Sequence, residues 1–163
     1  MKPLMLATDG SPTAAKATAT AIELAHKLRT DLVIVSVWDL PYTAYSAAGF
    51  APVPMNGELA KLGEEEATAT LLEAASRAEE AGVETRTAVL RGFPVEAICE
   101  AAGRFDPLYL VIGSHGWGAM KRALFGSVST GVLHHANCPV LVVRGETGAA
   151  EVTQDRSHET VHA

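Results

Sequence analysis

The sequence lacks the features that would place the protein in a membrane, in an oxidising compartment or on a nucleic acid. Its longest apolar runs, residues 32–37 and 108–112, have the length of strands and are far shorter than a bilayer span. Only two cysteines occur, Cys99 and Cys138, with no CxxC pair, and we predict two buried thiols in a reducing compartment. The formal net charge of −6 leaves no cationic excess to neutralise a nucleic-acid backbone. We therefore expect neither a membrane nor a nucleic acid as a partner.

The N-terminal residues also lack the apolar centre of a signal peptide, because the turn-like Thr8-Asp9-Gly10 follows Met1 too closely. Without a leader or a membrane segment, we expect a cytoplasmic protein. The hydrophobic content of 48% and the charged content of 20% are ordinary for a globular domain, and 163 residues are enough to bury a core.

Short apolar runs alternate along the chain with segments of helical periodicity. We predict strands at 2–7, 31–37, 84–90, 108–112 and 140–144, and helices at 13–28, 58–81, 94–102 and 128–136. The second and fourth strands are apolar without alternation, which is typical of strands covered on both faces. This order predicts an α/β fold, a Rossmann-like open sheet of five parallel strands with helices on both faces.

Two segments do not fit this alternation. Residues 38–56 contain three prolines and a glycine, and they are predicted to form a long irregular excursion beside a binding cleft. The C-terminal residues have few large apolar side chains and no period, so we expect one domain over 1–145 and a disordered tail over 146–163. In parallel sheets of this kind, ligands bind beyond the carboxyl ends of the strands, where the strand order reverses.

The segment between the fourth strand and the last helix combines glycines, cations and hydroxyls in one ordered string. Gly113 and Gly116 let the backbone turn sharply and approach a ligand, and Lys121-Arg122 adds positive charge to an acidic chain. Residues 126–129 then open a helix whose free amides and dipole favour a phosphate, with serine hydroxyls as further donors. The string predicts a triphosphate cradle, although it is neither a Walker loop nor a GxGxxG fingerprint.

Each part of this string also has a purely structural interpretation. Gly113 and Gly116 suit a turn between a strand and a helix, Ser127 suits a helix N-cap, and Lys121-Arg122 suits a solvated surface pair. Taken singly, each part favours the structural interpretation, whereas the ordered combination favours phosphate binding. His115, within the loop, either donates to a phosphate or has no role.

The spacing Gly113-x2-Gly116-x9-Gly126-Ser127 resembles the nucleotide-binding signature of the universal stress protein family. Residues 133–144 resemble that family's closing helix and strand, and residues 4–11 resemble its first strand and turn. Three separated segments therefore agree in order and spacing, and the resemblance covers residues 1–145. It implies an adenine-nucleotide α-hydrolase-like fold, usually homodimeric, with ATP bound by the members that keep the glycine signature.

The resemblance also implies which residues touch the nucleotide. Asp9, with Ala7 and Thr8, is expected near the adenosine, and Val37 is expected to line the adenine pocket. The residues expected beside the ribose and the phosphates are Ile112, Gly113, Gly116, Gly126, Ser127, Val128 and Ser129. The strand at 140–143 resembles the one that pairs across the family's homodimer. For Asp9 a second interpretation stays open, because an acid before Ser-Pro is also a natural helix cap.

No Ser-His-Asp, Cys-His or paired-carboxylate arrangement is suggested by spacing, so the sequence offers no obvious general base. We therefore expect an ATP-binding, nucleotide-dependent stress-response regulator with slow or no hydrolysis, and Mg²⁺ is a candidate to bridge the phosphate oxygens. An interaction module with an empty or other adenine-nucleotide site, and a slow ATPase or phosphoryl-transfer enzyme, stay open as alternatives. Residues 158–162 fit the HExxH pattern, but they lie in a polar segment without an apolar stripe, which argues against a zinc site.

Overall fold

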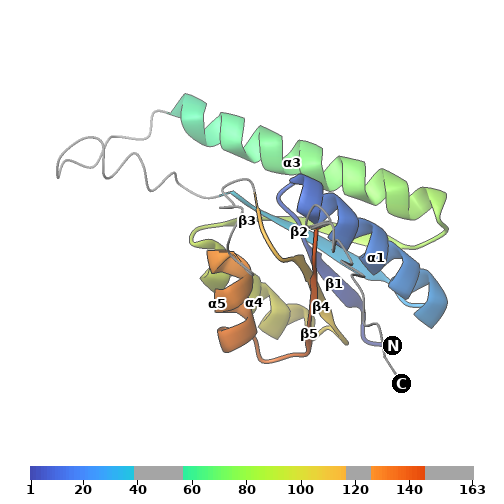
Figure 1. Cartoon of the computed structure of the whole chain (residues 1–163). Helices are drawn as coiled ribbons and strands as arrows, with labels where there is room; N and C mark the ends of the chain where they lie inside the picture. The colour runs from blue at the N-terminus through green and yellow to red at the C-terminus, as the bar shows by residue number, and fades with distance from the viewer. Residues whose placement is uncertain (39–56, 117–125, 146–163) are drawn as a thin grey trace, which may run out of the picture.

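Strands and helices alternate through the parts of the chain that the computed structural model describes, residues 1–38, 57–116 and 126–145. Their order is β1 (Leu4–Ala7), α1 (Pro12–Leu28), β2 (Leu32–Trp38), α3 (Gly57–Glu80), β3 (Thr85–Arg91), α4 (Pro94–Phe105), β4 (Leu110–Gly113), α5 (Ser127–His135) and β5 (Val140–Val143). Figure 1 traces them along the chain. Each predicted strand and helix is present within a few residues of its predicted bounds.

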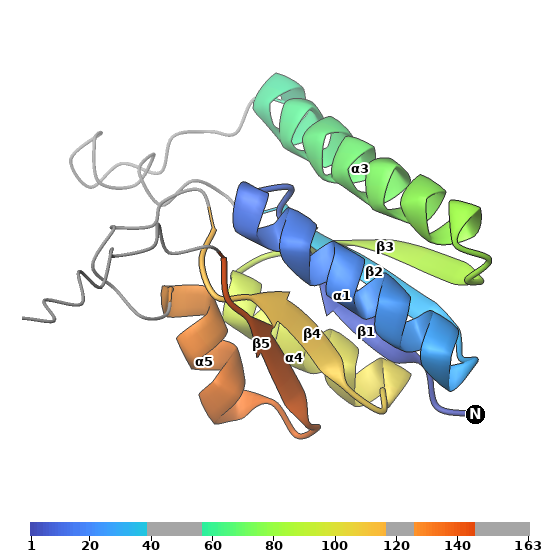
Figure 2. The same cartoon turned by 45° about the vertical axis from the view of Figure 1, so that its right-hand side comes forward.

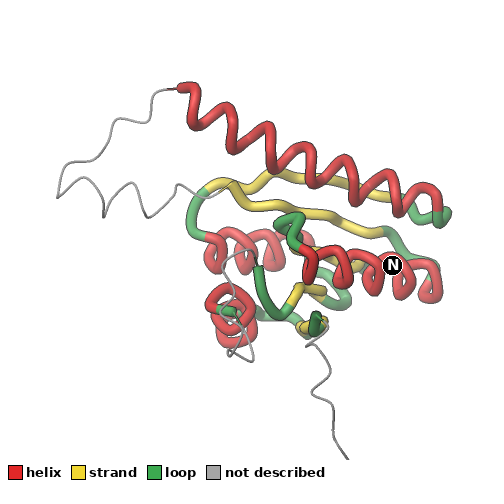
Figure 3. The backbone as a smooth tube through the Cα atoms, turned by 45° about the horizontal axis from the view of Figure 1, so that its top comes forward, coloured by secondary structure: helices red, strands yellow, loops and turns green. Residues whose placement is uncertain are grey.

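The five strands form one parallel sheet in the order β3-β2-β1-β4-β5. Helices α1 and α3 cover one face and α4 and α5 cover the other, as Figures 2 and 3 show. The predicted fold class is confirmed. The strand order reverses between β1 and β4, because the chain builds outward from β1 to β3 and then returns to the other side of β1.

The central strands are buried on both faces, which explains their continuous apolar sequences. Leu6 and Ile34 pack with α1 and α3 on one face, while Met5 and Val33 pack with α4 and α5 on the other. Successive side chains of a strand point to opposite faces, so a strand between two helical layers needs apolar residues at every position.

Helix α1 begins and packs as its sequence suggests. Ser11 caps it, because the Ser11 Oγ accepts a hydrogen bond from the Ala14 N–H (3.2 Å), and Pro12 occupies the first turn. Ala17 and Ala21 are fully buried against the sheet. Their small side chains allow the close approach of helix and sheet.

Most element bounds differ from the prediction by one to three residues. Helix α4 continues to Phe105 rather than ending at residue 102, and it is closed by Asp106 in the left-handed region (φ 45°), whose N–H donates to the Ala102 carbonyl. Strand β4 starts at Leu110 rather than residue 108, because the Leu108 N–H donates to the Pro3 carbonyl (2.8 Å) outside the sheet ladder. Strand β2 includes Trp38. The excursion predicted beyond it, over 39–56, lies outside the described residues.

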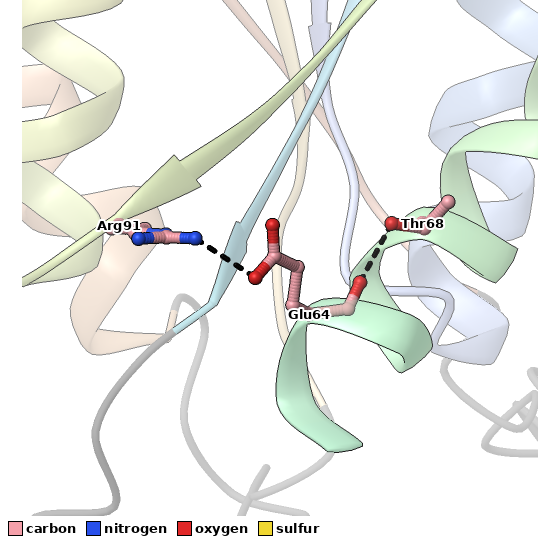
Figure 4. A network of polar contacts seen from close by, with 3 residues as sticks. All are labelled: Glu64, Thr68 and Arg91. Atoms are coloured by element: carbon pink, nitrogen blue, oxygen red, sulfur yellow. Dashed lines mark hydrogen bonds and ion pairs between the residues drawn. The ribbon is translucent and has the colours of Figure 1, made fainter. Parts of the chain in front are cut away.

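The start of α3 is held against the ends of β2 and β3. A Cβ atom at Gly63 would overlap the Trp38 indole, so α3 and β2 meet here at a distance that only glycine permits. Arg91 forms an ion pair with Glu64 (2.8 Å), and the Thr68 hydroxyl donates to the Glu64 carbonyl (2.7 Å), as Figure 4 shows. Both charged side chains are largely exposed, so the ion pair contributes below about 1 kcal/mol and the close packing matters more.

We expect Ile34→Ala to lower the free energy of unfolding by about 2–5 kcal/mol, because it leaves a cavity beneath α1 and α3. Leu72→Ala, on the exposed side of α3 with Leu72 63% exposed, is the control and should change stability by at most about 0.5 kcal/mol. Urea unfolding followed by circular dichroism compares the two. Equal losses would show that this strand is not central to the core.

Candidate functional site

Most of the predicted site residues lie where the carboxyl ends of β1 and β4 meet, which we call the β1–β4 crevice. Ala7 pairs with Ile112 across these strands, so the turn after β1 lies beside the loop that begins at Gly113. The first turn of α1 reaches the same place, because a Cβ atom at Gly113 would lie 3.3 Å from the Ala14 nitrogen. A reversal of strand order in a parallel sheet is where such folds bind ligands.

The turn after β1 is ordered by its own side chains. The Gly10 N–H donates to the Thr8 Oγ1 (3.3 Å), and the Ser11 N–H donates to the Asp9 Oδ1 (3.0 Å). Ser11 is the residue that caps α1, so the interpretation of Asp9 as the helix cap is wrong. The exposed Asp9 carboxylate is instead fixed at the edge of the sheet by a main-chain amide.

Asp9 and Gly116 approach each other closely at the β1–β4 crevice. A Cβ atom at Gly116 would overlap the Asp9 Oδ2, so this close approach explains the glycine. A carboxylate accepts hydrogen bonds from hydroxyl and amino groups, and it repels phosphate oxygens. Asp9 therefore suits the sugar or base end of a nucleotide better than the phosphate end.

Ser114 connects the parts of this edge, and its role cannot be predicted from the glycine spacing. Its side chain is 1% exposed, and its N–H donates to the Val143 carbonyl at the end of β5 (2.8 Å). Its carbonyl accepts from the Gly126 N–H (2.6 Å) and from the Ser129 Oγ (2.9 Å). Its own Oγ lies 3.0 Å from the His115 Nδ1. The one sequence signal for Ser114 is its place directly after a buried strand.

The start of α5 offers main-chain donors, although Gly126 is not among them. The Gly126 N–H is used by the Ser114 carbonyl, and a Cβ atom at Gly126 would lie 3.3 Å from that oxygen. Gly126 therefore contributes close approach rather than a donor. The amides of residues 127–129 have no acceptor within the helix and none among the described residues. They present N–H groups and the positive end of the helix dipole, which is the arrangement that binds anions.

The two serines of this first helical turn differ in their surroundings. Ser127 is exposed at the start of α5. Ser129 is 2% exposed, and its Oγ lies 2.9 Å from the Ser114 carbonyl and 3.0 Å from the Gly126 carbonyl. The Ser129 hydroxyl, which the sequence suggests as a phosphate donor, is thus directed into the loop. Its main-chain amide stays in the first turn of α5.

The other predicted residues lie at the ends of the strands. Ala7, Thr8 and Ile112 are buried there, and the Thr8 N–H donates to the Val35 carbonyl of β2 (3.0 Å). Val37 is half-buried at the end of β2, on the opposite side of β1 from β4. It packs against the same apolar cluster as Ile112. The loop residues 117–125, with the predicted cationic pair, lie outside the described residues.

An open groove of about 640 Å³ lies between the starts of α4 and α5. It is lined by Phe93, the N-cap of α4, by Pro94 and Cys99 of α4, and by Ser127 and Val128 of α5. The start of α5 therefore borders both this groove and the β1–β4 crevice. The groove adds apolar surface beside the first-turn amides of α5.

Neither cysteine provides a reactive thiolate. Both thiols are free and half-buried, whereas the sequence predicts buried thiols. Burial raises the pKa of Cys99, while burial, and then the nearby Cys99 and Asp106, raise the pKa of Cys138, so both are protonated at neutral pH.

Within the described ranges, no group of three or more His, Cys, Asp or Glu side chains is arranged to hold a metal ion. The HExxH pattern at 158–162 lies outside them. Of the helices that the structure describes, none is long and apolar enough to span a bilayer.

Residues 1–144 match the model of the universal stress protein family. The chain is 32% identical over 144 residues to universal stress protein MJ0531 of Methanocaldococcus jannaschii, covering 88% of this chain and 82% of that protein. It is 33% identical over 144 residues to universal stress protein YxiE of Bacillus subtilis, covering 86% of this chain and 97% of that protein.

The chain is also similar to solved structures, among them two of universal stress proteins. The structure of hypothetical protein MJ0577 superposes with a TM-score of 0.75 at 27% identity, covering 90% of this chain and 98% of that one. The structure of a universal stress protein in complex with cAMP superposes with a TM-score of 0.65 at 26% identity, covering 87% of this chain and 96% of that one. The structure of the universal stress protein from Archaeoglobus fulgidus in complex with dAMP superposes with a TM-score of 0.66 at 25% identity, covering 88% of this chain and 98% of that one.

We expect Ser129→Ala to lower the free energy of unfolding by about 1 kcal/mol, because the buried hydroxyl loses its hydrogen bond to the loop carbonyls. Ser127→Ala removes the same group two residues earlier at an exposed position, so it should cost at most about 0.5 kcal/mol. Chemical denaturation of both variants makes the comparison. A loss confined to Ser127→Ala would contradict the structural role assigned to Ser129.

Proposed function

The chain belongs to the universal stress protein family, and we propose that it binds an adenine nucleotide, ATP in particular, in the β1–β4 crevice. The observation that carries this proposal is the juxtaposition of Asp9, the close-packed Gly116 and the first-turn amides of residues 127–129 at the reversal of strand order. The related structures in complex with cAMP and dAMP support an adenine nucleotide as the ligand.

The polarity of the crevice suggests how the nucleotide lies. The amides and the dipole at the start of α5 favour the phosphates, while the Asp9 carboxylate favours ribose hydroxyls. We propose that Val37, half-buried at the end of β2, offers an apolar contact to the base. Because the chain carries a net charge of −6, Mg²⁺ bound to phosphate oxygens would reduce repulsion between ATP and the protein.

We propose binding with slow or no hydrolysis as the main event. Main-chain amides and a helix dipole stabilise a phosphate in the ground state as well as during transfer, and such uniform binding lowers the dissociation constant without accelerating chemistry. A protein of this kind acts through its nucleotide-bound and nucleotide-free forms. We therefore propose a nucleotide-dependent regulator of the stress response in the cytoplasm.

We expect Gly116→Ala to weaken Mg-ATP binding about tenfold or more, because the added methyl group must displace the Asp9 carboxylate. Gly103→Ala is the matched control, since a Cβ atom there would meet only Asn137 Nδ2 at an ordinary 3.6 Å within α4. Isothermal titration calorimetry measures both affinities, with circular dichroism to check folding.

The nucleotide itself is tested by denaturing the purified protein and separating the supernatant by chromatography. The proposed function predicts that ATP or another adenine nucleotide is released, or that it binds on titration with Mg²⁺. The proposal would be refuted if no adenine nucleotide were released and none bound on titration with Mg²⁺.

We also propose that β5 pairs with its counterpart in a second copy to form a homodimer. The two edge strands differ in character, because β3 carries Arg86 and Arg91, whereas all four residues of β5 are apolar and Leu141 is 36% exposed. An exposed apolar edge strand tends to pair with another strand, whereas charged side chains on an edge strand oppose such pairing. Leu133 of α5 adds exposed apolar surface near this edge.

The dimer edge can be tested with Val142→Pro. The Leu110 and Ser114 N–H groups donate to the carbonyls of Pro139 and Val143, so by alternation the Val142 N–H points to the open edge. Proline there removes an outward donor and keeps the pairing with β4. We expect the mass by light scattering to fall from two chains to one, while Val142→Thr stays dimeric. A monomeric wild type would refute the dimer.

A further inference from the structure

His115 lies between the two halves of the proposed site. It precedes Gly116, which is packed against the Asp9 carboxylate, and its Cα lies 3.5 Å from the position that a Cβ atom at Gly126 would take. The side chain of His115 is half-buried. Its backbone therefore runs between the Asp9 carboxylate and the N-cap of α5.

The hydroxyl of Ser114 restricts the tautomer of this imidazole. A buried hydroxyl that lacks an acceptor costs about 1–3 kcal/mol, and Ser114 is 1% exposed. Among the described residues, its Oγ has one polar neighbour, the His115 Nδ1 at 3.0 Å. A proton on Nδ1 would make Oγ the acceptor and leave the hydroxyl proton without a described acceptor. The contact therefore favours the tautomer in which the imidazole accepts at Nδ1 and carries its proton on Nε2.

We propose that Ser114 is a positioning residue that holds the His115 imidazole in the Nε2–H tautomer, and that this N–H donates a hydrogen bond to a phosphate oxygen of the bound nucleotide. The inference rests on the proposed function and adds a side-chain donor to the main-chain amides of α5. Because Ser114 also bonds to β5 and to Gly126, the imidazole is fixed to the same loop that builds the cradle. A donor fixed in this way loses little conformational freedom when the nucleotide binds.

Substitutions of matched shape test which ring nitrogen matters. Glutamine places an amide N–H near the position of Nε2, whereas asparagine places one near Nδ1. We expect His115→Ala and His115→Asn to weaken Mg-ATP binding about tenfold or more, the loss of one hydrogen bond to a charged group, and His115→Gln to stay within about threefold of the wild type. His134→Ala, exposed in the last turn of α5, is the control and should leave the affinity unchanged.

Ser114→Ala tests the positioning step. We expect it to weaken binding about threefold or more, and the Ser114→Ala/His115→Ala double variant to bind no more weakly than His115→Ala, because both act through one hydrogen bond. Nitrogen-15 NMR of the imidazole should show protonated Nε2 and bare Nδ1 in the wild type, and a mixture of tautomers in Ser114→Ala. A merely structural role for Ser114 would not move these signals.

The outcomes separate this inference from the proposed function. The inference alone would be overturned if the wild type binds Mg-ATP and His115→Ala binds it equally well. It would also be overturned by equal affinities of the His115→Gln and His115→Asn variants, or by a protonated Nδ1 in the wild type. A wild type that binds no adenine nucleotide would overturn the proposed function and the inference with it.

Discussion

The pairing of β1 with β4 is the constraint on which the site depends. It brings the turn after Ala7 beside the loop after Ile112, although the two segments are far apart in the sequence. Both strands are buried on both faces, so a slip of register by one residue would exchange the side chains of the two helical layers. The register therefore determines which two turns meet at this edge, the one that holds Asp9 and the one that holds Gly116.

Several donors of the loop after β4 that the sequence suggests for a ligand form hydrogen bonds within the protein. The Gly126 N–H and the Ser129 hydroxyl both donate to the Ser114 carbonyl, and the Ser114 N–H donates to the Val143 carbonyl of β5. Among the described main-chain groups of this loop, the first-turn amides of α5 have no acceptor, because helix geometry cannot satisfy them. The internal hydrogen bonds of the loop hold these amides beside the strand ends, and the proposed anion site rests on that placement.

The sequence predicts the layers of this fold better than its individual contacts. Continuous apolar runs identify the buried strands, because burial on both faces leaves no room for polar residues. The end of α4 is missed, since Gly103 is tolerated within the helix and Asp106 supplies the left-handed closure. The glycine spacing locates the loop after β4, but it gives no hint of Ser114, whose main-chain partners lie on β5 and α5. Likewise, Asp9 and Ser11 are both suitable helix caps, and three-dimensional geometry alone decides between them.

An acidic chain that binds a polyanion must rely on contacts of short range. Charges spread over the surface are screened beyond about 8 Å at physiological ionic strength, whereas amides in direct contact with a phosphate are not. The proposed phosphate contacts include the first-turn amides of α5, which are neutral donors that act at short range. In this proposal the Asp9 carboxylate accepts hydrogen bonds from the ribose. Such amides bind a phosphate about as well in the bound nucleotide as in a transition state, which fits the proposed binding with slow or no hydrolysis.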